Sequence, residues 1–89
     1  MSDMGTARVR LFARLSELAG TRETEVELGE GLTVGDVYEL LACRYPSLAG
    51  LKDTVMYALN SEYVKPDHSV RPGDEVALIP PVSGGAGAV

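Results

Sequence analysis

The sequence predicts an α+β domain, with one main helix across a mixed sheet of four to five strands and a flexible C-terminal tail. Only one segment shows the apolar period of a long helix. Shorter strand-like segments lie on both sides of it. The last residues combine a proline pair with a glycine-rich end, which neither helix nor strand favours. We therefore expect a disordered N-terminus over 1–6, one domain over 7–79 and a tail over 80–89.

Composition and charge narrow the possible functions. The 89 residues carry a net charge of −5, so nucleic acid and anionic membranes would repel the domain. The acidic surface suits a protein partner with a basic docking surface, although acidic residues can also serve only to keep a protein soluble. The N-terminus lacks the features of a secretory signal, and Cys43 has no second cysteine for a disulfide or a zinc cluster. We expect a cytoplasmic protein that binds no metal and has no membrane span.

The chain begins with a strand and a short helix. Residues 7–13 form the strand, because apolar Val9 and Leu11 alternate with Arg8, Arg10 and Phe12. A helical turn or two follows over 14–19, where apolar residues recur at helical spacing. Gly20 supplies the left-handed residue that ends it.

An edge strand and the main helix come next. Residues 23–28 send three glutamates to one side and apolar groups to the other, which is typical of an edge strand guarded by charge. The helix begins after Thr33 as N-cap, with Asp36 three residues on, and ends at Pro46. Its apolar stripe, flanked by Leu40, consists of Val34, Val37, Tyr38, Leu41 and Tyr45.

Three strands complete the predicted domain. Residues 55–60 form a strand that turns at Asn60, which tolerates a positive φ, into a short strand at 63–64. A Pro-Gly turn at 71–74 then leads into 75–79. That last strand is apolar on both faces, which predicts a central place in the sheet. This order of elements is the β-grasp arrangement of ubiquitin-like domains. A ferredoxin-like sandwich is the alternative, but it needs a second long helix.

Three segments carry a resemblance to a known family. They are residues 11–20, 59–64 and 74–85, and the last ends in Pro-Pro-Val-Ser-Gly-Gly. Together they resemble the MoaD/ThiS family of ubiquitin-like sulfur carriers, nearest to the small subunits of molybdopterin synthase. The resemblance extends from about Arg8 to Gly85, and the ending is its most specific part.

The resemblance implies a role in molybdenum cofactor biosynthesis. A ubiquitin-activating-like adenylyltransferase would use ATP to adenylate the Gly85 carboxylate, which becomes a thiocarboxylate. Its sulfur would attack a precursor held by the large subunit of molybdopterin synthase. The chain would bind no cofactor and would supply a reagent, with Gly84 giving clearance in a narrow channel. The lead-in to the two glycines would be Pro80, Pro81, Val82 and Ser83.

The sequence departs from the family pattern after Gly85. Residues 86–89 follow it, so the Gly85 carboxyl is an amide as written. Either a protease removes these residues, or the ending is unprocessed or non-native, or the chain no longer carries sulfur.

Other candidate residues lie on the predicted sheet. Phe12, Ala77 and Ile79 project from the face that the helix leaves uncovered, where they form a docking patch or are simply half-buried strand residues. Cys43, His68 and Ser83 lack the partners that catalysis or metal binding needs. Two other functions stay open: a carrier for thiamin thiazole, cysteine, tRNA thiolation or protein modification, and a non-covalent β-grasp adaptor with a frayed end.

Overall fold

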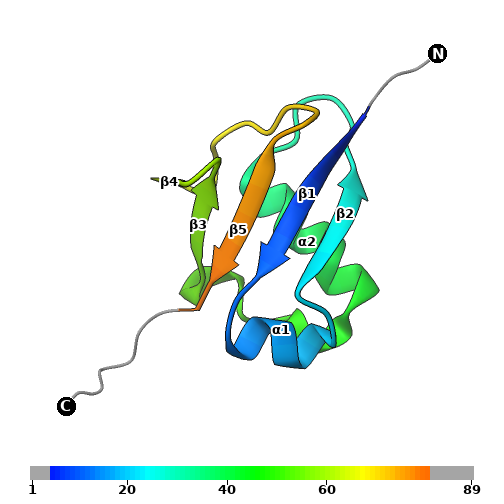
Figure 1. The fold of residues 1–89 in the computed structure, drawn as a ribbon, viewed down its shortest axis with the longest axis vertical. Helices are drawn as coiled ribbons and strands as arrows, with labels where there is room; N and C mark the ends of the chain where they lie inside the picture. The colour runs from blue at the N-terminus through cyan, green and yellow to red at the C-terminus, as the bar shows by residue number, and fades with distance from the viewer. Residues whose placement is uncertain (1–4, 81–89) are drawn as a thin grey trace.

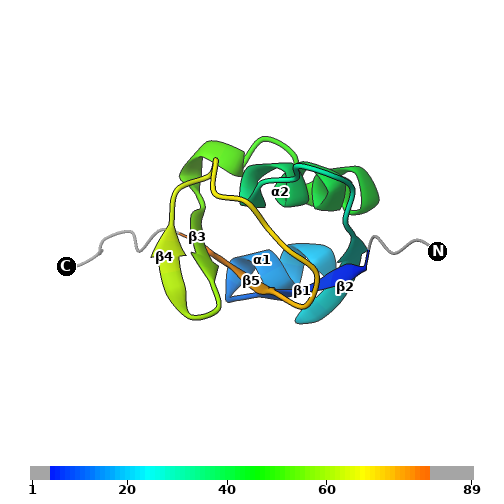
Figure 2. The ribbon, with the colours of Figure 1, turned by 90° about the horizontal axis from the view of Figure 1, so that it is seen from above.

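The computed structural model describes residues 5–80, which form one sheet with its main helix on one face (Figures 1 and 2). In chain order the elements are β1 (Thr6–Leu11), α1 (Arg14–Ala19), β2 (Glu23–Glu27), α2 (Val34–Arg44), the 3₁₀ turns η1 (Pro46–Leu48) and η2 (Lys52–Thr54), β3 (Met56–Leu59), β4 (Glu62–Val64) and β5 (Glu75–Ile79). The predicted α+β arrangement is confirmed. Because α1 has only six residues, the ferredoxin-like alternative does not fit the described part of the chain.

The sheet is mixed, with strand order β2-β1-β5-β3-β4. β5 pairs in parallel with β1 and antiparallel with β3, so it is central, as its two apolar faces predicted. β2 is an edge strand with its glutamates exposed, also as predicted. Figure 2 shows α2 on one side of the sheet, while no described element covers the other side.

The core lies between the sheet and α2. Val9, Val76 and Leu78 of the two central strands are fully buried, and so are Val37 and Leu41 of the helix. The predicted cap of α2 is also present. The Thr33 hydroxyl accepts from the Asp36 N–H at 3.1 Å, and the Asp36 carboxylate accepts from the Thr33 N–H at 3.0 Å. This capping box satisfies two backbone N–H groups at the start of the helix.

Several predicted boundaries were wrong. The first strand ends at Leu11 instead of residue 13, because Ala13 adopts φ 53° and ψ −128° and turns the chain into α1. The turns η1 and η2 were not predicted, although η1 delivers Leu48 to the core with no exposed surface. Leu40, predicted to flank the apolar stripe, is 42% exposed.

Replacing Ala13 by glycine should stabilise the fold. The backbone angles of Ala13 are strained for a residue with a Cβ atom and suit glycine. We expect Ala13→Gly to raise the free energy of unfolding by about 1 kcal/mol, and the melting temperature by roughly 4–8 °C. The matched control is Ala42→Gly inside α2, where glycine should instead cost about 1 kcal/mol. A loss of stability in both variants would show that Ala13 is not strained.

A pair of buried tyrosines lies between α2 and the sheet. The rings of Tyr38 and Tyr57 meet edge to face with centroids 6.3 Å apart. The Tyr38 hydroxyl donates to the Leu48 carbonyl at 2.7 Å, and the Tyr57 hydroxyl donates to the Lys52 carbonyl at 3.3 Å. Burial raises the pKa of Tyr57 to about 12, with smaller contributions from nearby carboxylates, and burial also raises the pKa of Tyr38.

These shifts predict alkaline destabilisation. The unfolded state releases the tyrosine protons near pH 10 while the folded state still holds them, so stability is intact below pH 10 and falls as the pH rises toward 12. Tyr57→Phe should make the fall shallower, because only Tyr38 then contributes. Urea unfolding at a series of pH values from 8 to about 12 measures the slope. Equal slopes in the two proteins would contradict the assignment.

Candidate functional site

The chain leaves the sheet at the end of its central strand. Ile79 is the last residue of β5, and half-buried Pro80 follows it where the chain leaves the sheet (Figure 1). Because β5 is held by neighbours on both sides, this exit point is fixed relative to the core. The other predicted tail residues, Pro81, Val82, Ser83, Gly84 and Gly85, lie outside the described residues.

A hollow on the open face of the sheet lies beside this exit. Its volume is about 220 Å³, and it brings together Phe12, Ala77 and Ile79, which the sequence had placed on this face. Phe12 is 39% exposed. The hollow's other lining residues are Arg10, Ala58, Ser61, Tyr63 and Glu75. We call this set the open-face hollow.

Strand register assembles the open-face hollow. Ala77 of β5 pairs with Arg10 of β1 on one side and with Ala58 of β3 on the other, and Ala58 pairs with Tyr63 of β4. Paired residues project from the same face of a sheet, so these side chains form one row across four strands. The next row holds Ile79 opposite Met56, which is 43% exposed.

Sequence reasoning missed Met56, Ala58 and Tyr63. Tyr63 is the most exposed large apolar side chain of the described residues, at 68%. The alternation around buried Tyr57 could have placed Met56 and Ala58 on the open face. No sequence signal could have placed Tyr63 in the same row as Ala77, because that depends on which strands are neighbours.

Charged residues line one side of the open-face hollow and the part of the open face beyond it. Arg8 pairs with Glu23 at 2.8 Å, and Arg10 pairs with Glu75 at 3.4 Å. The Arg10 guanidinium also lies 5.5 Å from the centre of the Phe12 ring, within cation–π range. Exposed pairs of this kind contribute little stability. Their effect is to divide the face into an apolar part at the chain exit and a charged part over β1 and β2.

The remaining candidates offer no catalytic arrangement. His68 lies in a second hollow with Asn60 and Asp74, but the Asn60 amide donates to the Asp74 carboxylate at 3.0 Å and accepts from the Glu75 N–H at 2.9 Å. Cys43 is exposed on α2. Within residues 5–80, no helix has the length and apolar character to cross a membrane.

Comparison with known proteins places this chain in a family. The ThiS family model matches residues 9–85. A molybdopterin synthase sulfur carrier subunit from Chlamydomonas reinhardtii is 41% identical over 80 residues, covering 88% of this chain and 96% of the relative.

Solved structures share the fold. The crystal structure of small archaeal modifier protein 1 from Haloferax volcanii superposes with a TM-score of 0.80 at 36% identity, covering 91% of this chain and 100% of that one. A complex of subunits 1 and 2 of the molybdopterin-converting factor from Helicobacter pylori matches with a TM-score of 0.61 at 18% identity, covering 90% of this chain and 99% of that one, which supports the fold alone. The fold is the β-grasp of ubiquitin-like proteins, and the chain belongs to the ThiS family.

Proposed function

We propose that this chain is the sulfur carrier subunit of a molybdopterin synthase and carries sulfur as a thiocarboxylate on Gly85. The main support is the Pro-Pro-Val-Ser-Gly-Gly segment 80–85, which directly follows the central strand of a ThiS-family domain whose relatives bear that name. A rigid exit point suits a carrier, because it limits the positions that the reactive end must search.

The chemistry divides one difficult substitution into easier steps. A carboxylate resists nucleophiles, so Gly85 first attacks the α-phosphate of ATP and displaces pyrophosphate, giving an acyl-adenylate. Sulfide then attacks the acyl carbon, and the C–S bond forms as the C–O bond to AMP breaks, which gives the thiocarboxylate whose ionised sulfur is the nucleophile. A separate adenylyltransferase binds the ATP. We place these steps in the cytoplasm, where ATP and reduced sulfur are available.

Activation at Gly85 requires a free carboxyl group. In this sequence Gly85 is joined to Ala86, so a protease must first hydrolyse that peptide bond. Gly84 and Gly85, on the N-terminal side of the reacting carbonyl, have no side chains and would leave it open to such an enzyme and to the adenylyltransferase.

The open-face hollow is the proposed docking surface for the large subunit and the adenylyltransferase. Phe12, Tyr63 and Ile79 give it an apolar centre with a charged border, which is the composition of protein interfaces. Its position beside Pro80 would aim the residues that follow into the active site of whichever partner is bound. The name of the Chlamydomonas reinhardtii relative, a sulfur carrier subunit of a synthase, supports a large-subunit partner.

Intact mass spectrometry tests the proposal. The chain ending at Gly85 is incubated with the cognate adenylyltransferase, ATP and a sulfur donor. Its mass should rise by the difference between one sulfur and one oxygen atom, and the gain should disappear when ATP is omitted. An unchanged mass with a partner that activates another carrier would refute the carrier role.

A second candidate function is protein modification. It is favoured by the likeness to small archaeal modifier protein 1. The same adenylate at Gly85 would then be attacked by a lysine amine of a target protein, forming an isopeptide bond. Covalent adducts in the native host that contain Gly85 joined to lysine would favour this function over sulfur transfer.

A further inference from the structure

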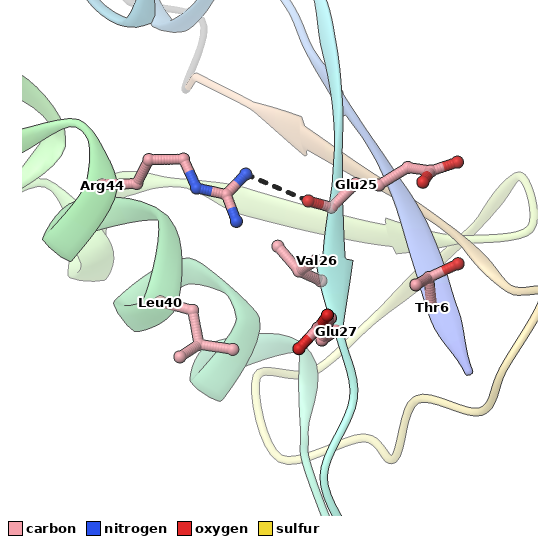
Figure 3. Close-up of a pocket in the computed structure, with 6 residues that line it drawn as sticks. All are labelled: Thr6, Glu25, Val26, Glu27, Leu40 and Arg44. Atoms are coloured by element: carbon pink, nitrogen blue, oxygen red, sulfur yellow. Dashed lines mark hydrogen bonds between the residues drawn. The ribbon is translucent and has the colours of Figure 1, made fainter. Parts of the chain in front are cut away.

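A groove lies on the side of the domain away from the chain exit, between the free edge of β2 and α2 (Figure 3). Its volume is about 510 Å³. Buried Val26 forms its floor, while Leu40 and Arg44 of α2 form one wall. Thr6 lines it at the start of β1, which is the opposite end of the sheet from Ile79. The groove is therefore separate from the open-face hollow.

The free edge of β2 presents unpaired backbone groups. The hydrogen bonds Leu11 N–H to Arg22 C=O and Leu28 N–H to Gly5 C=O fix the ladder with β1. Alternate residues of β2 bond β1, so Glu23, Glu25 and Glu27 direct their backbone groups outward. The Thr21 hydroxyl donates to the Glu23 carbonyl at 2.9 Å and accepts from the Glu23 N–H at 3.4 Å. The Arg44 guanidinium donates to the Glu25 carbonyl at 3.0 Å.

Three outward groups remain on this edge. Within residues 5–80, neither the N–H of Glu25 nor the N–H and C=O of Glu27 has a hydrogen-bond partner. The Glu25 carbonyl also keeps a second lone pair beside Arg44. An extended segment laid along β2 could therefore form a short ladder here.

Charge and burial define the segment that fits. Glu25 and Glu27 are exposed and form no ion pair within the described residues, whereas Glu23 is paired with Arg8. Residues of an added strand directly opposite Glu25 and Glu27 would share their face, so basic side chains suit those positions. The residues between them would face α2, where the 42% exposed Leu40 favours apolar side chains.

A second copy of this chain does not fit the same edge. Antiparallel pairing of β2 with another β2 would bring glutamates opposite glutamates, which is destabilising. The negative charge of the β2 glutamates therefore disfavours self-association and favours a strand with positive charge.

We propose that the β2–α2 groove binds an extended peptide segment of another protein, with alternating basic and apolar residues, as a sixth strand. This site does not depend on the sulfur-carrier role. It leaves the open-face hollow and the chain exit free, so both surfaces can be occupied at once.

Nuclear magnetic resonance titration of the ¹⁵N-labelled full chain tests the site. The probe is the acetylated and amidated peptide Lys-Val-Lys-Val-Lys-Val-Lys, and its matched control is Glu-Val-Glu-Val-Glu-Val-Glu. The basic peptide should shift the amide signals of Glu25, Glu27 and the Leu40–Arg44 turn in a saturable way. Equal binding of the acidic peptide, or shifts centred on Phe12 and Tyr63, would overturn the proposal.

Two variants separate charge from backbone pairing. Glu25→Gln combined with Glu27→Gln keeps every backbone group, and it should weaken binding about threefold to tenfold by removing two cross-strand charge pairs. Glu25→Pro removes one outward N–H without touching the ladder to β1 and should abolish the saturable shifts. Unchanged affinity in either variant, with a spectrum that shows a folded domain, would contradict strand addition.

Discussion

Deleting Gly84 and Gly85 is expected to abolish sulfur transfer and to leave stability unchanged. The deletion removes the proposed acyl group, and cleavage before Ala86 would then expose the carboxyl group of Ser83, which carries a side chain beside the reacting carbonyl. Stability should persist because the buried core of the described residues lies between Ala7 and Leu78. Thiocarboxylate formation is measured by intact mass, and the melting temperature by differential scanning calorimetry.

The matched control removes Ala86 to Val89 instead. That chain ends at Gly85, so it should accept sulfur without proteolysis and should make the protease dispensable. A fall of more than about 4 °C on deleting the two glycines would correspond to roughly 1 kcal/mol, and would place them in the fold rather than in a carrier segment. Retained sulfur transfer would place the reacting carboxyl elsewhere.

The position of a strand in the sheet could be predicted where the composition of that strand alone indicates it. β5 is apolar on both faces apart from Glu75, and a strand of that composition is favoured at the centre of a sheet, with a neighbouring strand on each side. β2 carries glutamate at alternate positions, which only an edge strand tolerates. The capping box of α2 is local too, since Thr33 and Asp36 are three residues apart. Each feature lies within a few residues of sequence.

Strain and register could not be predicted in this way. A positive φ at Ala13 contradicts the preference of a residue with a Cβ atom, and its carbonyl accepts hydrogen bonds from the Ser16 and Glu17 N–H groups at the start of α1. The open-face hollow joins residues 12, 58, 63 and 77, whose proximity depends on the pairing of four strands. Phe12, Ala77 and Ile79 could be predicted because they lie on β5 and at the end of β1. The residues from the β3–β4 hairpin could not.

A charge in the open-face hollow tests its proposed role as a docking surface. Ala77 lies at its centre, between Arg10 and Ala58 in the sheet, and remains partly exposed. We infer that a partner covering this row would have to bury whatever side chain stands there. The neighbouring Arg10 is already paired with Glu75 at 3.4 Å. A carboxylate buried without a partner of its own costs several kcal/mol, so its effect on binding should far exceed its effect on folding.

Ala77→Asp is therefore expected to weaken binding of the large subunit by about 100-fold or more, while far-ultraviolet circular dichroism still shows the native fold. Isothermal titration calorimetry with the purified large subunit gives the dissociation constant. Ala49→Asp adds the same charge at an exposed position after η1, outside the hollow, and should leave binding within about twofold, since an isolated surface charge is weakly felt. If both variants bound equally well, the partner would have to dock elsewhere. The open-face hollow would then be only the uncovered face of a sheet that packs a helix on one side.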